Sequence, residues 1–410
     1  MPFDLESIRT QFPSLSKTDD GAARLYFDNP AGTQVPTMVV ERMSDCLLEA
    51  NANIGGYFET SRRAGKVADD ARAAMADLLN APSRDEIIFG QNMTSLTFHV
   101  SRSIGRHLRA GDEIVLSQMD HDANVEPWVL LARDHDLKIR WLPFSSETFE
   151  FDLAALDNVL SDRTRLVCVG AASNLTGTIN DIGAICDKVR SAGAWSYIDA
   201  VQSAPHVVTD VQATGCDFLV CSAYKFFGPH QGILWGRSEV LEQLEPYKVR
   251  PAPRRLPWCF ETGTQSHEGM AGTAAAVDYF AAIGAAQVQG DRRKQLEAAL
   301  RLLFDYEQTL VSRLIDGLQQ LPGVKVQGIT DANAMRRRVP TVSFTHERHA
   351  PDAIAEAMAQ RNIFVWSGHN YALEAAKALG IDAAVRIGAV HYNSIEEIDT
   401  VLEALDQILA

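Results

Sequence analysis

The first two thirds of the chain alternate between two patterns of hydrophobic positions. Apolar residues recur at helical spacing over residues 37–53, 66–80 and 182–193, and this period predicts amphipathic helices. Short apolar runs between them predict β-strands. These runs cover residues 86–90, 113–117, 165–170, 195–200, 217–222 and 232–236. Such alternation indicates an α/β fold with a mostly parallel sheet that is covered by helices on both faces.

The pattern changes after residue 290. A long stretch of helical period covers residues 295–321, and a second one covers residues 394–409. Three strand-like runs lie between them, at residues 339–346, 362–368 and 385–392. This order of elements predicts a second, smaller domain of α+β type.

Composition excludes several classes of protein. The chain carries 38 basic and 53 acidic side chains, a formal net charge of −15, whereas non-specific nucleic-acid binding needs Lys and Arg to neutralise phosphates. No apolar run approaches the ~18 residues of a membrane span, and the N-terminal stretch lacks the apolar core of a secretory signal. The six cysteines form no C-x-x-C pair, and no histidine cluster has zinc spacing. We therefore expect reduced thiols, no metal site, no nucleic-acid or membrane partner, and a cytoplasmic location.

Polar side chains follow the strand-like runs at the points where these runs end. Ligands of open α/β sheets bind beyond the carboxyl ends of the strands, so we expect these side chains to converge on one rim. In chain order they are Thr94, Ser95, His121, Asn174, Asp199, Ser222 and Lys225.

The segment SAYKFFGP places one amine, that of Lys225, among aromatic and apolar residues. A lysine amine can form a Schiff base with the aldehyde of pyridoxal phosphate. That cofactor withdraws electrons only while its pyridine nitrogen stays protonated, and a buried carboxylate beside the nitrogen keeps the proton there. Asp199, which ends a strand-like run, is the candidate for this carboxylate.

The other polar side chains match the remaining groups of such a cofactor. A phosphate binds hydroxyls and free backbone N–H groups at a helix N-terminus; Thr94 and Ser95 offer both, and Ser222 adds a hydroxyl near the lysine. The flat ring of His121 could stack on the cofactor ring. The amides that could hydrogen-bond the ring hydroxyl are those of Asn174 and Gln202.

Each of these residues also has a purely structural interpretation. The carboxylate and the two hydroxyls before helix-like stretches could be ordinary N-caps. His121 could be an exposed side chain in an acidic loop, and Lys225 could belong to a turn. Taken singly, these interpretations are the more frequent ones. The joint order of all these residues at strand ends favours a cofactor site.

Several segments together resemble the class V aminotransferase and cysteine desulfurase family, whose members are pyridoxal-phosphate enzymes of fold type I. In order, these segments are YFDNPAGTQVP, HDANVEPW, SNLTGT, IDAVQSAPH, SAYKFFGP, FETGT and VRIGAVHYNSIEEID. The resemblance implies a large domain at residues 23–288 with a mostly parallel seven-stranded sheet. It also implies a smaller α+β C-terminal domain at residues 289–410, against which an N-terminal segment, residues 1–22, packs.

The resemblance also implies a role for each site residue. The catalytic groups would be Lys225, which bonds to the cofactor, Asp199 at its ring nitrogen and His121 on its ring face. Arg386 would pair with the substrate α-carboxylate at two points, and Asn29 and Asn174 would be further substrate contacts. The cofactor contacts would be Thr94, Ser95, His121, Asn174, Asp199, Gln202, Ser222, Lys225 and Thr264.

Assembly is implied by the segment FETGT. Thr264 in this segment would reach the cofactor phosphate of a neighbouring subunit. The resemblance therefore implies a homodimer with shared active sites.

The chain departs from the family pattern at three places. Tyr224 replaces the histidine that usually precedes the lysine, and residues 51–61 differ from the usual basic segment. Residues 367–386 contain no cysteine, although desulfurases of the family carry their nucleophilic thiol there. Among the remaining thiols we interpret Cys221 as a buried core residue, and Cys259 is the one credible substitute.

The sequence therefore predicts a pyridoxal-phosphate enzyme that acts on an amino acid by β-elimination of the C–S lyase type, without a protein persulfide. Transamination and epimerisation are alternatives, because all three reactions begin by removing the same α-proton. A non-catalytic scaffold or regulator with this fold is a remote alternative. The joint presence of Lys225, Asp199 and Arg386 argues against it.

Overall fold

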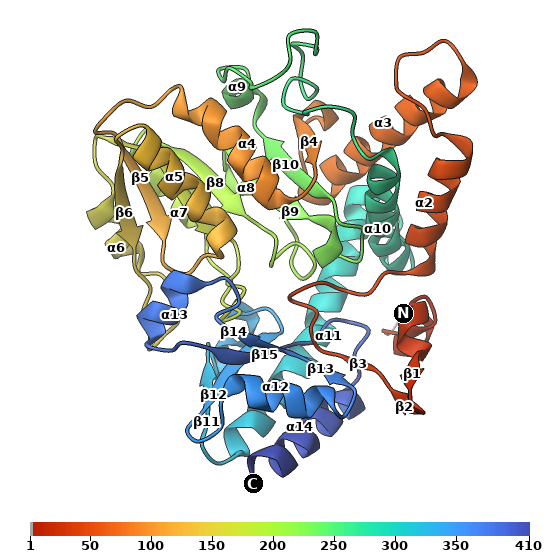
Figure 1. Cartoon of the computed structure of the whole chain (residues 1–410), viewed down its shortest axis with the longest axis vertical. Helices are drawn as coiled ribbons and strands as arrows, with labels where there is room; N and C mark the ends of the chain where they lie inside the picture. Colours follow the sequence, from red (N-terminus) through yellow and green to blue (C-terminus); the bar gives the residue numbers. More distant parts are fainter. Residues whose placement is uncertain (1–2) are drawn as a thin grey trace.

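The computed structural model describes residues 3–410, which form a larger and a smaller part (Figure 1). A seven-stranded sheet in the order β4-β10-β9-β8-β7-β5-β6 forms the centre of the larger part. Neighbouring strands are parallel except around β10, which runs antiparallel to β4 and β9. The strands are β4 (Ile87–Gly90), β5 (Glu113–Ser117), β6 (Lys138–Leu142), β7 (Thr164–Gly170), β8 (Trp195–Asp199), β9 (Phe218–Ser222) and β10 (Gly232–Gly236). The predicted, mostly parallel seven-stranded sheet is thus confirmed.

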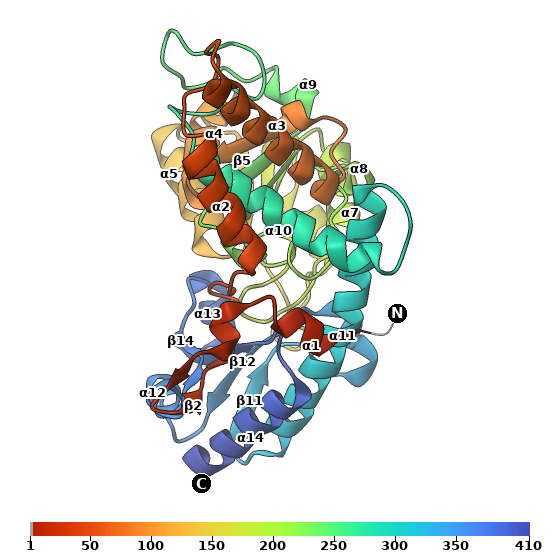
Figure 2. The ribbon, with the colours of Figure 1, turned by 90° about the vertical axis from the view of Figure 1, so that its right-hand side faces the viewer.

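Helices cover both faces of this sheet (Figures 1 and 2). Strand β7 shows why: Val167 and Val169 point to one hydrophobic cluster, while Leu166 and Cys168 point to the other. Helices α3, α7 and α10 contribute to the first cluster, and α4 and α5 to the second. The helices of this part are α2 (Thr37–Glu49), α3 (Glu59–Leu79), α4 (Met93–Gly105), α5 (Glu126–Asp134), α6 (Leu153–Val159), α7 (Ile182–Ser191), α8 (Val211–Thr214), α9 (Ser238–Leu241) and α10 (His267–Ala285).

The smaller part is built on a four-stranded antiparallel sheet in the order β11-β12-β15-β14. Helices α12 and α14 pack on it (Figure 1). Its strands and helices are β11 (Val324–Gln327), β12 (Thr341–His346), α12 (Pro351–Ala359), β14 (Trp366–Gly368), α13 (Leu373–Leu379), β15 (Ala384–Gly388) and α14 (Ile395–Leu409). This arrangement confirms the smaller α+β domain that the sequence predicts.

One helix, α11 (Arg292–Gln320), joins the two parts (Figure 1). Near its N-terminus Leu296 and Leu303 belong to the core of the larger part, whereas Leu310 and Leu318 belong to the core of the smaller part. A single amphipathic face therefore contributes to both cores. The predicted boundary at 288/289 falls in the link between α10 and α11, and it stays a prediction.

The N-terminal segment contacts the smaller part. Arg9 forms an ion pair with Glu397 of α14 at 2.8 Å. Just beyond the segment, strand β3 (Leu25–Tyr26) pairs in parallel with β13 (Ile363–Phe364). The predicted segment 1–22 begins with two residues outside the described range, and its boundary at 22/23 stays a prediction. The remaining short elements are α1 (Leu5–Arg9), β1 (Thr18–Asp19), β2 (Ala22–Ala23) and the 3₁₀ helices Pro13–Ser16, Arg84–Glu86, Asp122–Asn124, Ala223–Lys225 and Ala332–Arg337.

Several elements of the structure were not predicted from the sequence, among them β11, α10 and α12, and two further differences concern strands. Strand β6 was not predicted, because Lys138 and Arg140 are exposed on this edge strand and interrupt the apolar pattern. The run predicted at 362–368 is divided: β13 pairs with the N-terminal β3, while β14 pairs with β15. Within residues 3–410, no helix is long and apolar enough to cross a membrane.

Candidate active site

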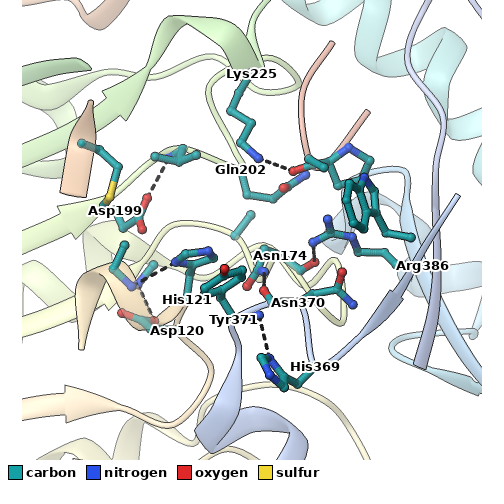
Figure 3. A pocket seen from close by; sticks show the side chains of 18 of the residues that line it. Asp120, His121, Asn174, Asp199, Gln202, Lys225, His369, Asn370, Tyr371 and Arg386 are labelled. Atoms are coloured by element: carbon teal, nitrogen blue, oxygen red, sulfur yellow. Dashed lines mark hydrogen bonds between the residues drawn. The ribbon is translucent and has the colours of Figure 1, made fainter. Parts of the chain in front are cut away.

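A cavity of about 390 Å³ lies where the carboxyl ends of the parallel strands face the smaller part (Figure 3). The larger part contributes the end of β8, the turn after β9 and the loops after β5 and β7. The smaller part contributes β15 and residues 366–371. Of the predicted site residues, those that line the cavity are Thr94, His121, Asn174, Asp199, Gln202, Lys225 and Arg386. The sheet topology brings them together because parallel strands end at one edge.

Lys225 lies in a 3₁₀ turn directly after β9. Its Nζ donates a hydrogen bond to the carbonyl oxygen of Pro30. Burial removes water from the ammonium, and together with the nearby positive charge of Arg386 this lowers the lysine pKa to about 7. A substantial fraction of this amine is therefore neutral, and hence nucleophilic, near pH 7.

Two buried carboxyls face the same cavity. Asp199 ends β8 and accepts a hydrogen bond from the Val201 N–H at 2.8 Å; burial raises its pKa to about 6. The other is the carboxyl of Asp120, which was not among the predicted site residues. It accepts hydrogen bonds from Ser117 Oγ at 2.5 Å and from the Gly170 N–H at 2.8 Å, and burial raises its pKa to about 7. Asp120 directly precedes His121 and lies three residues after the strand-like run 113–117. This position would have allowed the sequence to predict it as a site residue.

The imidazole of His121 is neutral over the physiological pH range. Burial and the positive charges of Lys225 and Arg386 lower its pKa to about 3. Its Nδ1 accepts a hydrogen bond from the Ala123 N–H at 3.0 Å. The phenol ring of Tyr371 stacks on it, with ring centroids 5.4 Å apart and planes inclined by 18° (Figure 3).

Arg386 and Asn174 connect the two parts of the molecule across the cavity. Arg386 Nη1 donates to the Asn174 carbonyl oxygen at 3.0 Å, and Asn174 Nδ2 donates to the Asn370 carbonyl oxygen at 2.7 Å. Burial lowers the pKa of Arg386 to about 10, so the guanidinium stays charged near neutral pH. Arg386 Nε and Asn174 Oδ1 are buried without a hydrogen-bond partner in residues 3–410. Buried polar atoms are normally paired, so these two atoms suit a polar ligand.

The N-terminus of α4 offers a place for an anion. Thr94, in the first turn of this 13-residue helix, lines the cavity. Ser222 Oγ accepts from the Met93 N–H at 3.1 Å, and Ser95 donates its hydroxyl to Asn92 Oδ1 at 3.1 Å. Ser95 and Ser222 are thus engaged in shaping this turn and are outside the cavity lining. Gly232 permits the turn, because a Cβ there would lie 2.3 Å from the Asn92 backbone.

Two other predicted residues lie away from this cavity. Thr264 is exposed and lines a separate hollow beside Asn53 and His267. Asn29 is buried; its Nδ2 donates to the Tyr26 and Gly388 carbonyl oxygens, and its Oδ1 accepts from a tyrosine hydroxyl. Its predicted substrate contact stays a prediction. Gln202 lines the cavity, and its Nε2 donates to Thr341 Oγ1 at 2.9 Å.

Tyr224 replaces the expected histidine before the lysine. It lines the cavity, its ring stacks on His230 with centroids 4.9 Å apart, and Lys225 Nζ lies 4.9 Å from its ring centroid. The ring therefore faces the reactive amine as a cation–π neighbour.

All six cysteines are buried, and within the described chain none lines the cavity. Burial raises the pKa of the Cys259 thiol, and it raises that of Cys221 still further. Residues 367–386 contain no cysteine, and this segment brings Tyr371 to the cavity instead. Asn370 and Tyr371 both have left-handed backbone conformations, with φ of 52° and 58°.

Comparison with known proteins agrees with this geometry. A family model described as aminotransferase class-V matches residues 25–401. The chain is 31% identical over 423 residues to a cysteine desulfurase of Yersinia pestis (strain Pestoides F), which covers 100% of this chain and 99% of that protein. The apo cysteine desulfurase of Thermococcus onnurineus NA1 has a TM-score of 0.88 at 28% identity, covering 98% of each chain. The cysteine desulfurase CsdA (S-sulfonic acid) of Escherichia coli has a TM-score of 0.86 at 26% identity, covering 100% of this chain and 99% of that one.

The chain belongs to the aminotransferase class-V family. It is accordingly a pyridoxal-phosphate-dependent enzyme of the cysteine desulfurase-like group with fold type I, as its motifs predict. The cavity fits this cofactor. It combines a neutralisable lysine amine, a buried carboxyl for the ring nitrogen, a flat neutral imidazole and a helix N-terminus for the phosphate.

Proposed function

We propose that this protein is a lyase that removes a β-substituent, such as a sulfur group, from an α-amino acid. When bound at this site, pyridoxal phosphate supplies the electron sink that weakens the bonds to the substrate α-carbon. Sulfur leaves as sulfide or as a small thiol, without passing through a protein persulfide.

Lys225 and Asp199 would hold and move the protons, and His121 would support the cofactor ring. Lys225 would hold the cofactor through its amine and, once free, take the proton from the substrate α-carbon. Its pKa of about 7 suits a general base near neutral pH. Asp199 would keep the cofactor ring nitrogen protonated, and His121, being neutral, would lie flat on the ring without adding charge.

The remaining residues would bind and orient. Arg386 would hold the α-carboxylate through two parallel hydrogen bonds, which use its unpaired Nε. Asn174 would contact the cofactor ring hydroxyl or the substrate, and Gln202 the same hydroxyl. Thr94, with the backbone of the α4 N-terminus, would hold the phosphate; direct contacts from Ser95 and Ser222 stay predictions.

The single observation that carries the choice of elimination is the burial of every thiol. A persulfide needs a thiolate that can reach the substrate sulfur, and burial raises the pKa of Cys259 and Cys221. The segment in which desulfurases of the family carry their thiol, residues 367–386, brings Tyr371 to the cavity instead. A phenol cannot accept sulfur in this way.

We also propose that the active unit is a homodimer and that the enzyme works in the cytoplasm. Thr264 is exposed and separated from its own chain's cavity. That position suits a residue whose hydroxyl completes the phosphate site of a neighbouring subunit. The reduced state expected of six buried, unpaired thiols suits a reducing compartment.

The test is to incubate the holoenzyme with L-cysteine and S-substituted cysteines and to assay pyruvate, sulfide or thiol, amino-group transfer to an added keto acid, and loss of substrate chirality. We expect pyruvate and sulfide or thiol in equal amounts. Keto-acid-dependent amine transfer or racemisation without pyruvate would instead establish the aminotransferase or epimerase alternative.

The expected absence of a protein persulfide is tested by a separate measurement. Thiols are alkylated after reaction with L-cysteine, and every cysteine peptide is searched by mass spectrometry for an added sulfur. We expect none in the wild type. Tyr371→Cys is the positive control, because it puts a thiol at an exposed position of the cavity wall. A stoichiometric persulfide on Cys259 or Cys221 of the wild type, lost with activity on alanine substitution, would overturn the proposal.

A further inference from the structure

The outer wall of the cavity differs in character from its floor. The charged groups of the lining are Asp120, Asp199, Lys225 and Arg386, and the proposed function uses the last three for cofactor and α-carboxylate. The outer wall is one continuous segment, residues 366–371, with the sequence WSGHNY. It contains no acidic residue, lysine or arginine.

Two aromatic rings of this outer wall are open to solvent. Tyr371 is 66% exposed and Trp366 is 52% exposed, although both line the cavity. Exposed aromatic rings on a cavity wall commonly serve as contact surfaces for a ligand, because they bury a large apolar area with few side-chain rotors to order.

The backbone holds Tyr371 in place from both sides of the cavity. Its carbonyl oxygen accepts from the Asp122 N–H at 2.7 Å, and its own N–H donates to His369 Nδ1 at 3.1 Å. The preceding Asn370 carbonyl oxygen accepts from Asn174 Nδ2 at 2.7 Å. Left-handed φ values at two successive residues other than glycine are uncommon and persist only where surrounding contacts hold them. The ring that lies parallel to His121 (Figure 3) is therefore a rigid platform.

The carboxyls near this platform, those of Asp122, Glu126 and Glu374, lie outside the cavity lining. Burial raises the pKa of Asp122, the two glutamates raise it further, and His369 lowers it. A charged group that enters the outer cavity would lose hydration without a charged partner on the wall.

We propose that Tyr371 and Trp366 form an aromatic subsite that selects amino acids with a bulky, uncharged, apolar β-substituent, such as S-benzyl-cysteine and related thioethers. This inference rests on the proposed function for its reaction. Lys225 removes the α-proton, the Cβ–S bond breaks, and its electron pair leaves on sulfur, which is protonated to the thiol. The remaining unsaturated amine takes up water and gives pyruvate and ammonia, so that no oxidant or reductant is needed.

The test measures kcat/KM for pyruvate release from S-benzyl-, S-methyl-, S-carboxymethyl- and S-(2-aminoethyl)-L-cysteine with wild type, Tyr371→Ala, Tyr371→Phe and Leu373→Ala. The benzyl-to-methyl ratio, which is kcat/KM for the S-benzyl substrate divided by kcat/KM for the S-methyl substrate, is compared between variants. Differences between the two leaving groups cancel in this comparison. Leu373 is the matched control, since it is 47% exposed on the neighbouring helix but outside the cavity lining.

We expect the wild type to favour the benzyl substrate over both charged substrates by about tenfold or more. Tyr371→Ala should lower the benzyl-to-methyl ratio by about tenfold, the scale of one aromatic stacking contact. Tyr371→Phe should keep the ratio because it keeps the ring, and Leu373→Ala should leave it unchanged. An unchanged ratio in Tyr371→Ala, loss of the ratio in Tyr371→Phe, or a wild-type preference for a charged substituent would overturn the subsite.

Failure of the reaction is distinguishable from failure of the subsite. If no substrate yields pyruvate, the proposed elimination is wrong, and the same compounds are then titrated against the holoenzyme while the absorbance of the bound cofactor is followed. A benzyl-to-methyl ratio of dissociation constants that falls in Tyr371→Ala but not in Tyr371→Phe would support the subsite alone. Equal affinities in all proteins would remove it.

Discussion

At the scale of single residues, the reactivity of Lys225 is set by its neighbours. Burial removes the water that stabilises an ammonium, the charge of Arg386 opposes protonation, and the charges of Asp199 and Asp28 favour it. The balance lowers the pKa to about 7, well below the ~10.4 of a solvated lysine. The same burial raises the pKa of Asp199 to about 6.

The pH dependence of cofactor loading follows from this pKa. A neutral amine attacks the aldehyde, so raising the pH through 7 increases the reactive fraction of Lys225. We expect the rate of pyridoxal-phosphate addition to the apoenzyme, followed by absorbance, to rise about tenfold from pH 5.5 to 6.5 and to level out above about pH 7.5. Free lysine, the control, should keep gaining rate beyond that range.

Asp199→Asn tests the cause of the shift. The negative charge of Asp199 raises the pKa of Lys225, so its removal should move the midpoint of the loading profile to lower pH. The variant should also lose most turnover, because an amide cannot keep the cofactor ring nitrogen protonated. A midpoint that stays in place or moves upward would contradict this electrostatic assignment.

At the scale of elements, α11 joins the two cores around a buried polar cluster. Glu307 is fully buried on this helix; it pairs with His206 Nδ1 at 2.8 Å and accepts from the His391 N–H at 3.1 Å. His391 Nε2 lies 2.7 Å from the hydroxyl of Tyr279 on α10. His206 follows β8 and His391 follows β15, so the cluster ties the strands that carry Asp199 and Arg386 to one helix.

Removing this carboxylate should destabilise the fold. Glu307→Ala leaves buried donors from both parts unpaired, and we expect the free energy of unfolding to fall by about 3 kcal/mol or more. Denaturant unfolding measures the change. Glu297→Ala on the same helix is the control: its ion pairs with Arg293 and Arg301 lie near the surface and should contribute less than about 1 kcal/mol. If both variants lowered the free energy of unfolding by a similar small amount, the cluster would not hold the two parts together.

At the scale of the whole molecule, apolar side chains are exposed on α2 and on the loop that follows it. Figure 2 shows α2 along one flank of the larger part. The largest exposures are 80% for Leu48 and 98% for Tyr57. Patches of this kind mark interaction surfaces, and this one adjoins the hollow that contains Thr264 through residues 53–55. Residues 51–63, whose role the sequence leaves open, form part of it.

We therefore expect a dimer in solution at micromolar concentration, measured by light scattering or sedimentation. Leu48→Glu with Tyr57→Glu should weaken assembly and, with it, cofactor retention. Leu373→Glu, at an exposed site elsewhere, should change neither assembly nor cofactor retention. A monomer that keeps full activity on dilution would contradict shared active sites.

The sequence by itself determined the layers of the fold and the class of enzyme. The apolar runs in β5, β8 and β9 end in polar residues, and polar residues follow β7 within four positions. This local pattern predicts parallel strands and a rim of ligands. The chemistry that each residue type supplies points to Lys225 and Asp199, and the resemblance to the family adds Arg386. Strand β6 was missed because its exposed charges mask the pattern.

Only the tertiary structure decided how these groups act on one another. The pKa values of Lys225 and His121 depend on burial by segments far away in the chain. The pairing of Asn174 with Arg386 joins residues 212 positions apart. Tyr371 reaches His121 because a left-handed turn of the smaller part crosses the cavity to the larger one. Side-chain environment is a property of packing between remote segments, and the local order of residues does not contain it.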